Sequence, residues 1–194
     1  MSELFSIQLQ NRQQQGGDGV WLDLPTTTEQ VQAALRQIGI SSDNPQGLFI
    51  SGYFAEEEKR FAIPYNMVLA SNVDELNFLA ARLETLSAGE RAELNAALQA
   101  PQSELSSIGR ITDFPENVDY YVHLPDVHGP AQLGDYYLNR SGMVDMPEEW
   151  KGGIDTAQFG RYVAQQEQGA FTQYGYLVKS GDEWQKVHEG QPVP

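Results

Sequence analysis

The 194-residue sequence contains no cysteine. A disulfide framework, a thiolate metal site and a thiol nucleophile are therefore excluded, and the composition suits a reducing compartment, so we expect a cytoplasmic protein.

Basic residues are also scarce: 12 Lys and Arg stand against 27 Asp and Glu, which gives a formal net charge of -15. Such a charge repels nucleic acid and anionic membranes and predicts a basic partner, although solubility alone also accounts for it.

Long hydrophobic runs are absent as well. The sequence has no stretch of about 18 uncharged apolar residues, and its N-terminal segment lacks a basic start followed by an apolar run, so we expect a soluble, unprocessed chain. Hydrophobic residues nevertheless make up 40% of the chain, with 3 Trp, 9 Tyr and 8 Phe. This is enough apolar surface to build a core, and it predicts a folded protein.

The usual catalytic patterns are missing. Neither a G-x-S-x-G elbow nor an S-x-x-K pair occurs, and the glycines of 16–19 lack the lysine and the following helix of a phosphate-binding loop. Glu148 and Glu149 are candidates for general acid and base work, but they follow Pro147 and so fit a helix first turn, where carboxylates complement the dipole. We expect no catalytic site and no cofactor.

A metal site is the remaining chemical candidate. His123 and His128 lie five residues apart with Asp126 between them, a spacing that matches no metalloprotease pattern. Pro125 and Gly129 predict a loop here. We therefore expect two solvated loop histidines and no bound metal.

The patterns predict an α+β protein, an elongated chain of three small domains. Residues 1–66 are expected to form a small α/β sheet domain whose strands are 4–9, 20–24, 47–54 and 61–65. Thr26 with Glu29 has the form of a capping box that opens a helix, and Gly39 is expected to end it.

Residues 67–110 are expected to form a helical bundle, because apolar residues recur there at helical spacing. Capping signals predict helices that start near Ser71, Ser87 and Pro101.

Residues 111–194 are expected to form a mixed, mostly helical C-terminal domain, because prolines divide this stretch into short elements. Its predicted helices are 133–139 and 155–165. A closing hairpin is expected from strands 171–179 and 183–187, joined at 180–182.

The placement of the acidic residues is more informative than their number. Residues 111–160 alone carry 9 acids and 2 bases. Carboxylates four apart on a helix lie about 5 to 6 Å apart, and duplex DNA carries one charge per roughly 1.7 Å, so such a surface is able to imitate phosphates. The candidate target-binding acids are Asp74, Glu75, Glu84, Glu90, Glu93, Glu104, Asp113, Glu116, Asp119, Asp126, Asp135, Asp145, Glu148, Glu149 and Asp155.

The order of several short motifs resembles the ArdA antirestriction proteins. Val20-Trp21-Leu22-Asp23-Leu24-Pro25 is similar to the family's early W-x-x-x-P strand, and Asp74-Glu75-Leu76-Asn77 to the start of its middle domain. The strongest similarity is to the family's antirestriction region, and it is carried by Leu133, Gly134, Tyr136, Tyr137, Gly142, Val144, Pro147, Trp150, Ile154, Phe159, Gly160 and Arg161.

The resemblance covers most of residues 4–178, with departures. Tyrosines do not flank Ile154-Asp155, Tyr162 replaces the acid that usually follows Gly-Arg, and the chain continues to Pro194. The aromatic residues of the region also fit a packing role, and Arg161 is expected to pair with Asp155 or to cap a carbonyl.

The resemblance implies a non-catalytic inhibitor that imitates bent B-form DNA. Family members form homodimers, bind the methyltransferase core of type I restriction-modification enzymes and are carried on conjugative elements. Direct binding of nucleic acid or membrane is not expected. Two alternatives remain: an acidic protein that targets another DNA-binding protein, and a hydrolase built on Glu148 and Glu149 or on the His123 segment.

Overall fold

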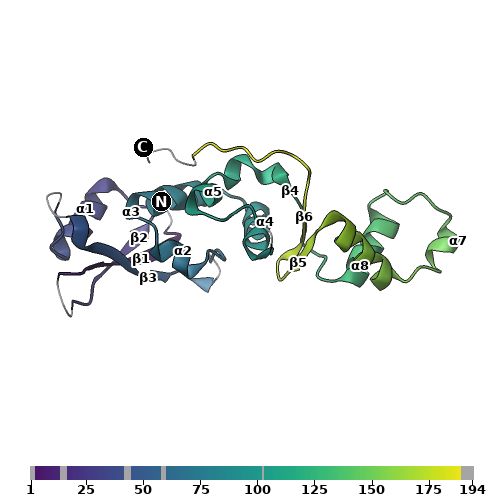
Figure 1. The fold of residues 1–194 in the computed structure, drawn as a ribbon, viewed down its shortest axis with the longest axis horizontal. Helices are drawn as coiled ribbons and strands as arrows, with labels where there is room; N and C mark the ends of the chain where they lie inside the picture. Colours follow the sequence, from purple (N-terminus) through teal and green to yellow (C-terminus); the bar gives the residue numbers. More distant parts are fainter. Residues whose placement is uncertain (1–2, 14–16, 42–44, 58–59, 102, 189–194) are drawn as a thin grey trace. The chain divides into compact units, whose positions relative to one another are not determined.

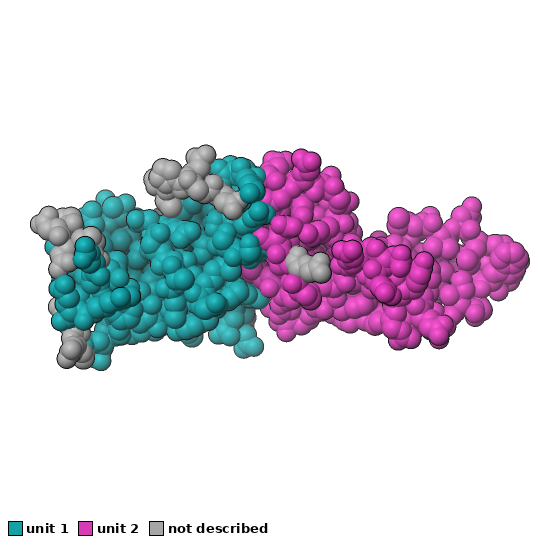
Figure 2. Space-filling model, in the orientation of Figure 1, with its two compact units in different colours: residues 1–87, 105–116, 186–194 teal, residues 88–104, 117–185 magenta. Residues whose placement is uncertain are grey.

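The computed structural model describes residues 3–13, 17–41, 45–57, 60–101 and 103–188. It confirms an α+β chain, with short helices and two small antiparallel sheets (Figure 1). Contacts within the chain divide it into two compact units (Figure 2). Unit 1 contains residues 1–87, 105–116 and 186–194, and unit 2 contains residues 88–104 and 117–185.

These two units differ from the three domains expected from the sequence. Residues 88–104 belong to unit 2, whereas the rest of the predicted helical bundle, 67–87 and 105–110, belongs to unit 1. Helical periodicity locates helices but does not identify the partners on which they pack. The three-domain arrangement therefore stays a prediction.

The sheet of unit 1 has the strand order β2-β1-β3, with both pairings antiparallel. Its strands are β1 (Phe5–Asn11), β2 (Val20–Leu24) and β3 (Leu48–Phe54). Alternation along β1 buries Phe5, Ile7 and Leu9 on one face of the sheet. The three strands confirm the predictions made from the same alternation.

Helix α1 (Thr28–Gln37) begins one residue later than the predicted capping box implies. The box is formed by Thr27 and Gln30, whose side chains exchange hydrogen bonds with each other's backbone N–H, and not by Thr26 and Glu29. Consecutive threonines here offer the same pattern in two registers, so the sequence did not distinguish them. Gly39 follows the helix with φ +69°, as expected for a helix end.

The predicted strand at 61–65 is wrong. Phe61 and Ile63 are buried, but the segment pairs with no strand in the described part of the chain, and α2 (Tyr65–Leu69) begins directly after Pro64. Proline lacks the N–H that a strand ladder needs. A short 3-10 turn, η1 (Pro45–Gly47), precedes β3.

Helix α3 (Val73–Glu84) is capped by Asn72 and not by Ser71. The Asn72 side chain accepts a hydrogen bond from Glu75 N at 2.9 Å, while the Ser71 hydroxyl donates to Met67 O. The apolar face of α3 packs on α5 (Ile108–Thr112), which is followed by η3 (Phe114–Glu116).

Unit 2 begins with α4 (Ala88–Gln99), which confirms the helix predicted after Ser87. Its sheet has the order β4-β6-β5 and is antiparallel. The strands are β4 (Tyr121–Leu124), β5 (Ala170–Thr172) and β6 (Gly175–Lys179), and η4 (Val118–Tyr120) precedes β4.

The predicted closing hairpin is therefore wrong. Its turn lies between β5 and β6, where Gly175 has φ +118°, and residues 183–187 form no strand. The other edge of β6 pairs with β4, more than 50 residues earlier in the chain. A local turn signal at 180–182 could not reveal this distant partner.

A helical lobe connects β4 to β5. It contains α6 (Pro130–Asp135), the π-helical turn η5 (Tyr136–Arg140), α7 (Glu148–Lys151) and α8 (Thr156–Glu167). The predicted helices at 133–139 and 155–165 are confirmed, and α6 packs along α8. Within the described ranges, none of the helices has the length and apolar character required to cross a membrane.

Candidate functional site

The fifteen candidate acids differ in exposure. Eight are exposed: Asp74, Glu116, Asp119, Asp126, Asp145, Glu148, Glu149 and Asp155. Six are half-buried: Glu75, Glu84, Glu90, Glu93, Glu104 and Asp135. Both units carry exposed members, so neither unit alone holds the whole candidate surface.

Asp113 is the one buried acid of the set, and its side chain has no exposed area. Its Oδ1 accepts hydrogen bonds from the backbone N–H of His188 at 2.7 Å and from His188 Nδ1 at 2.9 Å. The carboxylate therefore holds the C-terminal segment against the end of α5. We remove Asp113 from the candidate surface because a partner cannot reach it.

Several of the remaining acids form ion pairs with neighbouring cations. The pairs are Glu116 with Arg82, Glu104 with Lys179 at 2.7 Å, Asp135 with Arg140 at 3.4 Å, and Glu148 with Lys151 at 2.7 Å. Exposed pairs contribute little to stability, about 0 to 1 kcal/mol each. Each pair also reduces the local negative charge, so these acids attract a cationic partner less strongly than their number implies.

Glu93 lies half-buried on α4 in unit 2. Burial, and then the negative charges of Glu90 and Asp119, raise the pKa of Glu93 to about 8. Its Oε1 is buried and accepts no hydrogen bond from the residues that the structure describes. Near neutral pH this carboxyl is mostly protonated, so it adds little charge to the surface.

The candidate acids between η5 and α8 are all exposed. Glu148 and Glu149 occupy the first turn of α7, and the side chain of Glu148 is 81% exposed. Asp155 caps α8, because its Oδ1 accepts hydrogen bonds from Ala157 N at 2.9 Å and Gln158 N at 3.0 Å. These carboxylates complement the helix dipole and still face solvent.

Two glycines of the antirestriction-like region allow α6 and α8 to cross at backbone contact. A Cβ on Gly160 would lie 1.8 Å from Pro130 O, and a Cβ on Gly134 would lie 2.0 Å from Thr156 O. No side chain fits at either position without moving a helix. The two glycines are therefore required for packing.

A half-buried carboxylate and two tyrosines connect this helix pair to the sheet. Tyr176 OH donates to Glu167 at 2.5 Å, and Tyr137 OH donates to the second oxygen of Glu167 at 2.8 Å. Burial and the neighbouring carboxylate raise the pKa of both phenols. Both tyrosines therefore remain protonated donors throughout the physiological range.

The other residues of the region divide between interior and surface. Leu133 is fully buried against Val127 and Tyr176. Half-buried positions are Tyr136, Val144, Ile154 and Phe159, and exposed positions are Gly142, Pro147, Trp150 and Arg161. Gly142 has φ +69°, the left-handed conformation that favours glycine. Arg161 forms no ion pair with Asp155, which caps α8 instead.

The two N-terminal motifs meet within unit 1. Asn77 Oδ1 accepts a hydrogen bond from Thr26 N at 2.7 Å, and Asn77 Nδ2 donates to Thr26 O at 3.0 Å. Asn77 comes from the D-E-L-N segment, and Thr26 directly follows Pro25, the first residue after β2. The amide therefore attaches α3 to the end of β2.

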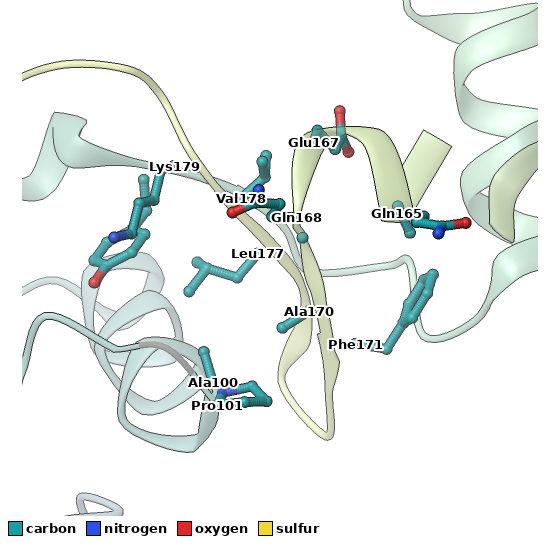
Figure 3. A pocket seen from close by; sticks show the side chains of 13 residues that line it. Ala100, Pro101, Gln165, Glu167, Gln168, Ala170, Phe171, Leu177, Val178 and Lys179 are labelled. Carbon is teal, nitrogen blue, oxygen red and sulfur yellow. The ribbon is translucent and has the colours of Figure 1, made fainter. Parts of the chain in front are cut away.

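Unit 2 has an open pocket of about 540 Å³ between the end of α4, β6 and the segment that joins α8 to β5 (Figure 3). Its lining is largely apolar and includes Pro101, Phe171 and Leu177. Two charged side chains also line it. Glu167 is held by the two tyrosines, and Lys179 pairs with Glu104, so this lining does not supply the converging carboxylates that a hydrolase needs.

The predicted loop is confirmed for His128 and is wrong for His123. His123 lies in β4, where its Nε2 donates to Tyr174 O at 2.7 Å, while His128 is exposed beyond the strand. Among the described residues, no group of three His, Cys, Asp or Glu side chains has the arrangement of a metal site. The first histidine therefore serves as a hydrogen-bond donor that holds the β5–β6 turn.

Sequence reasoning missed Glu167 and the role of Asn77. A signal for Glu167 existed, because packed tyrosines need hydrogen-bond partners and the aromatic residues of this region were expected to fit a packing role. Asn77 was placed on a helix, but the sequence contained nothing that connects it to Thr26, 51 positions earlier. Both residues act through contacts between distant segments.

A comparison with protein families supports the motif order independently. A family model described as Antirestriction protein (ArdA) matches residues 16–178 of this chain. The matched range covers well over half of the sequence and includes both crossing glycines, α7 and the Glu167 cluster. A search of curated proteins found no match.

Proposed function

Because this chain belongs to the ArdA family of antirestriction proteins, we propose that it inhibits type I restriction-modification enzymes by imitating B-form DNA in their DNA-binding groove. The observation that carries the proposal is the distribution of exposed carboxylates over both units, within a chain of net charge -15. A basic groove that binds phosphates also attracts such a surface.

The proposed mechanism is collective. DNA-binding proteins gain much of their affinity by pairing Lys and Arg with phosphates and releasing counterions. An exposed carboxylate pairs with the same cations, but each pair contributes only about 0 to 1 kcal/mol. Many such pairs are needed together, which favours a surface that extends over more than one helix.

The proposed target-binding acids are the fourteen candidates that remain after Asp113 is removed, of which Glu93 contributes little charge near neutral pH. Those that are exposed and without an ion pair to a cation of the described chain are the strongest candidates, and they include Asp74, Asp119, Glu149 and Asp155. The antirestriction-like region contributes mainly by holding the lobe in shape. Its glycines and Tyr137 pack the interior, while α7 presents acids to solvent.

Three further properties are part of the proposal, because the family implies them. The inhibitor acts as a homodimer, its partner is the methyltransferase core of the restriction enzyme, and it works in the cytoplasm on behalf of an incoming conjugative element. It binds neither nucleic acid nor membrane directly, since both repel its charge. Its action requires no catalytic step and no cofactor.

Competition with DNA tests the proposal. The purified chain is mixed at low salt with the methyltransferase core of several type I enzymes and a labelled target duplex, and displacement of the duplex is measured. We expect displacement that weakens as salt rises. If no enzyme of the panel releases its DNA, while pull-down from lysate recovers a different DNA-binding protein, the alternative target class is favoured.

A further inference from the structure

The outer face of the unit 1 sheet carries an ordered set of aromatic and acidic side chains. Residues two apart on a strand share a face, and cross-strand partners lie side by side. The strand registers therefore place two adjacent rows on this face, which are Trp21, Gln8 and Gly52, and then Asp23, Ser6 and Phe54. The opposite face carries the buried Phe5 and Ile7.

Two large rings of this face are exposed to solvent. Trp21 is 50% exposed and Phe54 is 55% exposed. The indole of Trp21 reaches across β1, because a Cβ on Gly52 would lie 3.0 Å from its Cη2 atom. Gly52 and Phe54 are two apart on β3, so the indole ends beside the Phe54 position.

Carboxylates flank the two rings. Asp23 is exposed and accepts a hydrogen bond from Ser6 Oγ at 2.7 Å. On the other side of Ser6, one shallow depression is lined by Phe54 together with Glu3 and Glu56. The small side chain of Ser6 thus lies between acids, with the two rings close by.

We propose that this face binds an arginine side chain of the partner protein. A guanidinium group is planar, stacks on aromatic rings and donates paired hydrogen bonds to a carboxylate. Trp21 and Phe54 provide the rings, and Asp23 provides the acceptor. This inference deepens the proposed function and rests on it in one respect: the arginine belongs to the partner's DNA-binding surface.

The chemistry of the face favours a guanidinium group over other partners. A nucleobase also stacks on rings, but its phosphates are repelled by Asp23 and by the acids beside Phe54. A purely apolar partner would bury these carboxylates without a counter-ion, at a high cost in free energy. A lysine ammonium is compact and strongly hydrated, so it gains less than a guanidinium from the rings.

The first experiment needs no restriction enzyme. The full chain is labelled with 15N and titrated with N-acetyl-arginine amide, with the lysine analogue and with the neutral isostere N-acetyl-citrulline amide. The indole N–H signal of Trp21 is followed, and it is assigned by its absence from Trp21→Phe. Trp150, which is 67% exposed and follows two acids on α7, is the internal reference.

We expect the arginine compound to shift the Trp21 signal, the lysine compound to shift it less and citrulline to leave it unchanged. Phe54→Leu, which keeps an apolar side chain but removes the ring, is expected to reduce the response severalfold. The proposal is overturned if Trp21 responds equally to arginine and citrulline, or no more than Trp150 does.

The second experiment connects this face to the inhibitor. Trp21→Ala is expected to weaken binding to the methyltransferase core about fivefold, with an unchanged slope against salt because no charge is removed. Trp21→Phe is expected to restore most of the affinity. If the wild type binds the methyltransferase core and Trp21→Ala binds it equally well, the arginine site is contradicted but the proposed function is not. If the wild type does not bind, the proposed function is contradicted, and the titration alone then tests the arginine site.

Discussion

Two neighbouring parts of the antirestriction-like region differ in the role of their residues. One is the crossing of α6 and α8, the other is the short helix α7, and both lie within about 40 residues. At the crossing, Gly134 and Gly160 are enclosed by the backbone of the neighbouring helix. In α7, Glu149 and Trp150 face solvent. One family-like pattern can therefore combine positions that hold a lobe together with positions that are free to meet a partner.

The largest effect is expected from Gly160→Ala, which tests the packing side of this comparison. The added Cβ would meet Pro130 O at 1.8 Å, so α6 and α8 must separate, and we expect a loss of about 3 kcal/mol of stability. Denaturant unfolding followed by circular dichroism measures it.

Gly152→Ala is the matched control for this substitution. Gly152 ends α7 with φ -63°, and a Cβ there would meet nothing within 4 Å. Alanine is therefore expected to be neutral or slightly stabilising. Equal losses in the two variants would show that the close approach of the helices is unimportant.

A smaller loss is expected from Tyr137→Phe. The substitution removes one of the two tyrosine hydroxyls that donate to Glu167, a charge-assisted hydrogen bond that contributes about 2 kcal/mol. Because the pKa of Tyr137 is raised, this contribution is complete below the ordinary tyrosine pKa and is lost only as pH rises through the higher folded-state value.

The unfolding free energy of Tyr137→Phe is therefore measured at pH 7. Tyr174→Phe is its control, since the Tyr174 contacts found in the structure involve its backbone atoms. A loss that is the same in both variants would remove the special role of the Glu167 cluster.

The pH dependence of stability distinguishes Glu93 from the exposed acids. The folded pKa of about 8 lies above the unfolded value of 4.5, so the protein loses stability from this group as pH rises from about 4.5 through 8. Glu93→Gln removes that loss and is expected to raise the melting temperature more at pH 9 than at pH 5. Glu149→Gln, at an exposed position, is expected to give no such difference, and equal pH profiles for the two variants would contradict the account.

The smallest effects are expected on the exposed side of the comparison. Glu148→Gln and Glu149→Gln should each weaken displacement of DNA from the methyltransferase core about two- to threefold, because each removes one weak ionic contact of about 0.5 kcal/mol. Their melting temperatures should stay within about 2 °C of the wild type. A large loss of stability with either substitution would mean that α7 also belongs to the packing region.

Local structure was largely predictable from the sequence, and long-range packing was not. Alternation predicted β1, β2 and β3, and the helix predicted over 155–165 matches most of α8. The pairing of β4 with β6 and the burial of Asp113 depend on segments more than 50 residues apart. No periodicity within a window of one element carries that information.

The sequence was also unable to predict which acids of the candidate surface are exposed and charged. Charge counting identified the acidic stretch 111–160, but it could not separate exposed Glu149 from buried Asp113 or from Glu93 with its raised pKa. Trp21 and Phe54 were assigned to strands, yet the sequence did not show that they share a face across β1, because this depends on the strand registers.

The salt dependence of binding tests the central claim most directly. The affinity of the intact chain for the methyltransferase core of a type I enzyme is measured from about 50 to 200 mM salt and plotted on logarithmic axes. If exposed carboxylates replace phosphates, the affinity falls steeply and linearly as salt rises on these axes. The double variant with Glu148→Gln and Glu149→Gln is then expected to have a shallower slope. A flat slope at measurable affinity would contradict the account.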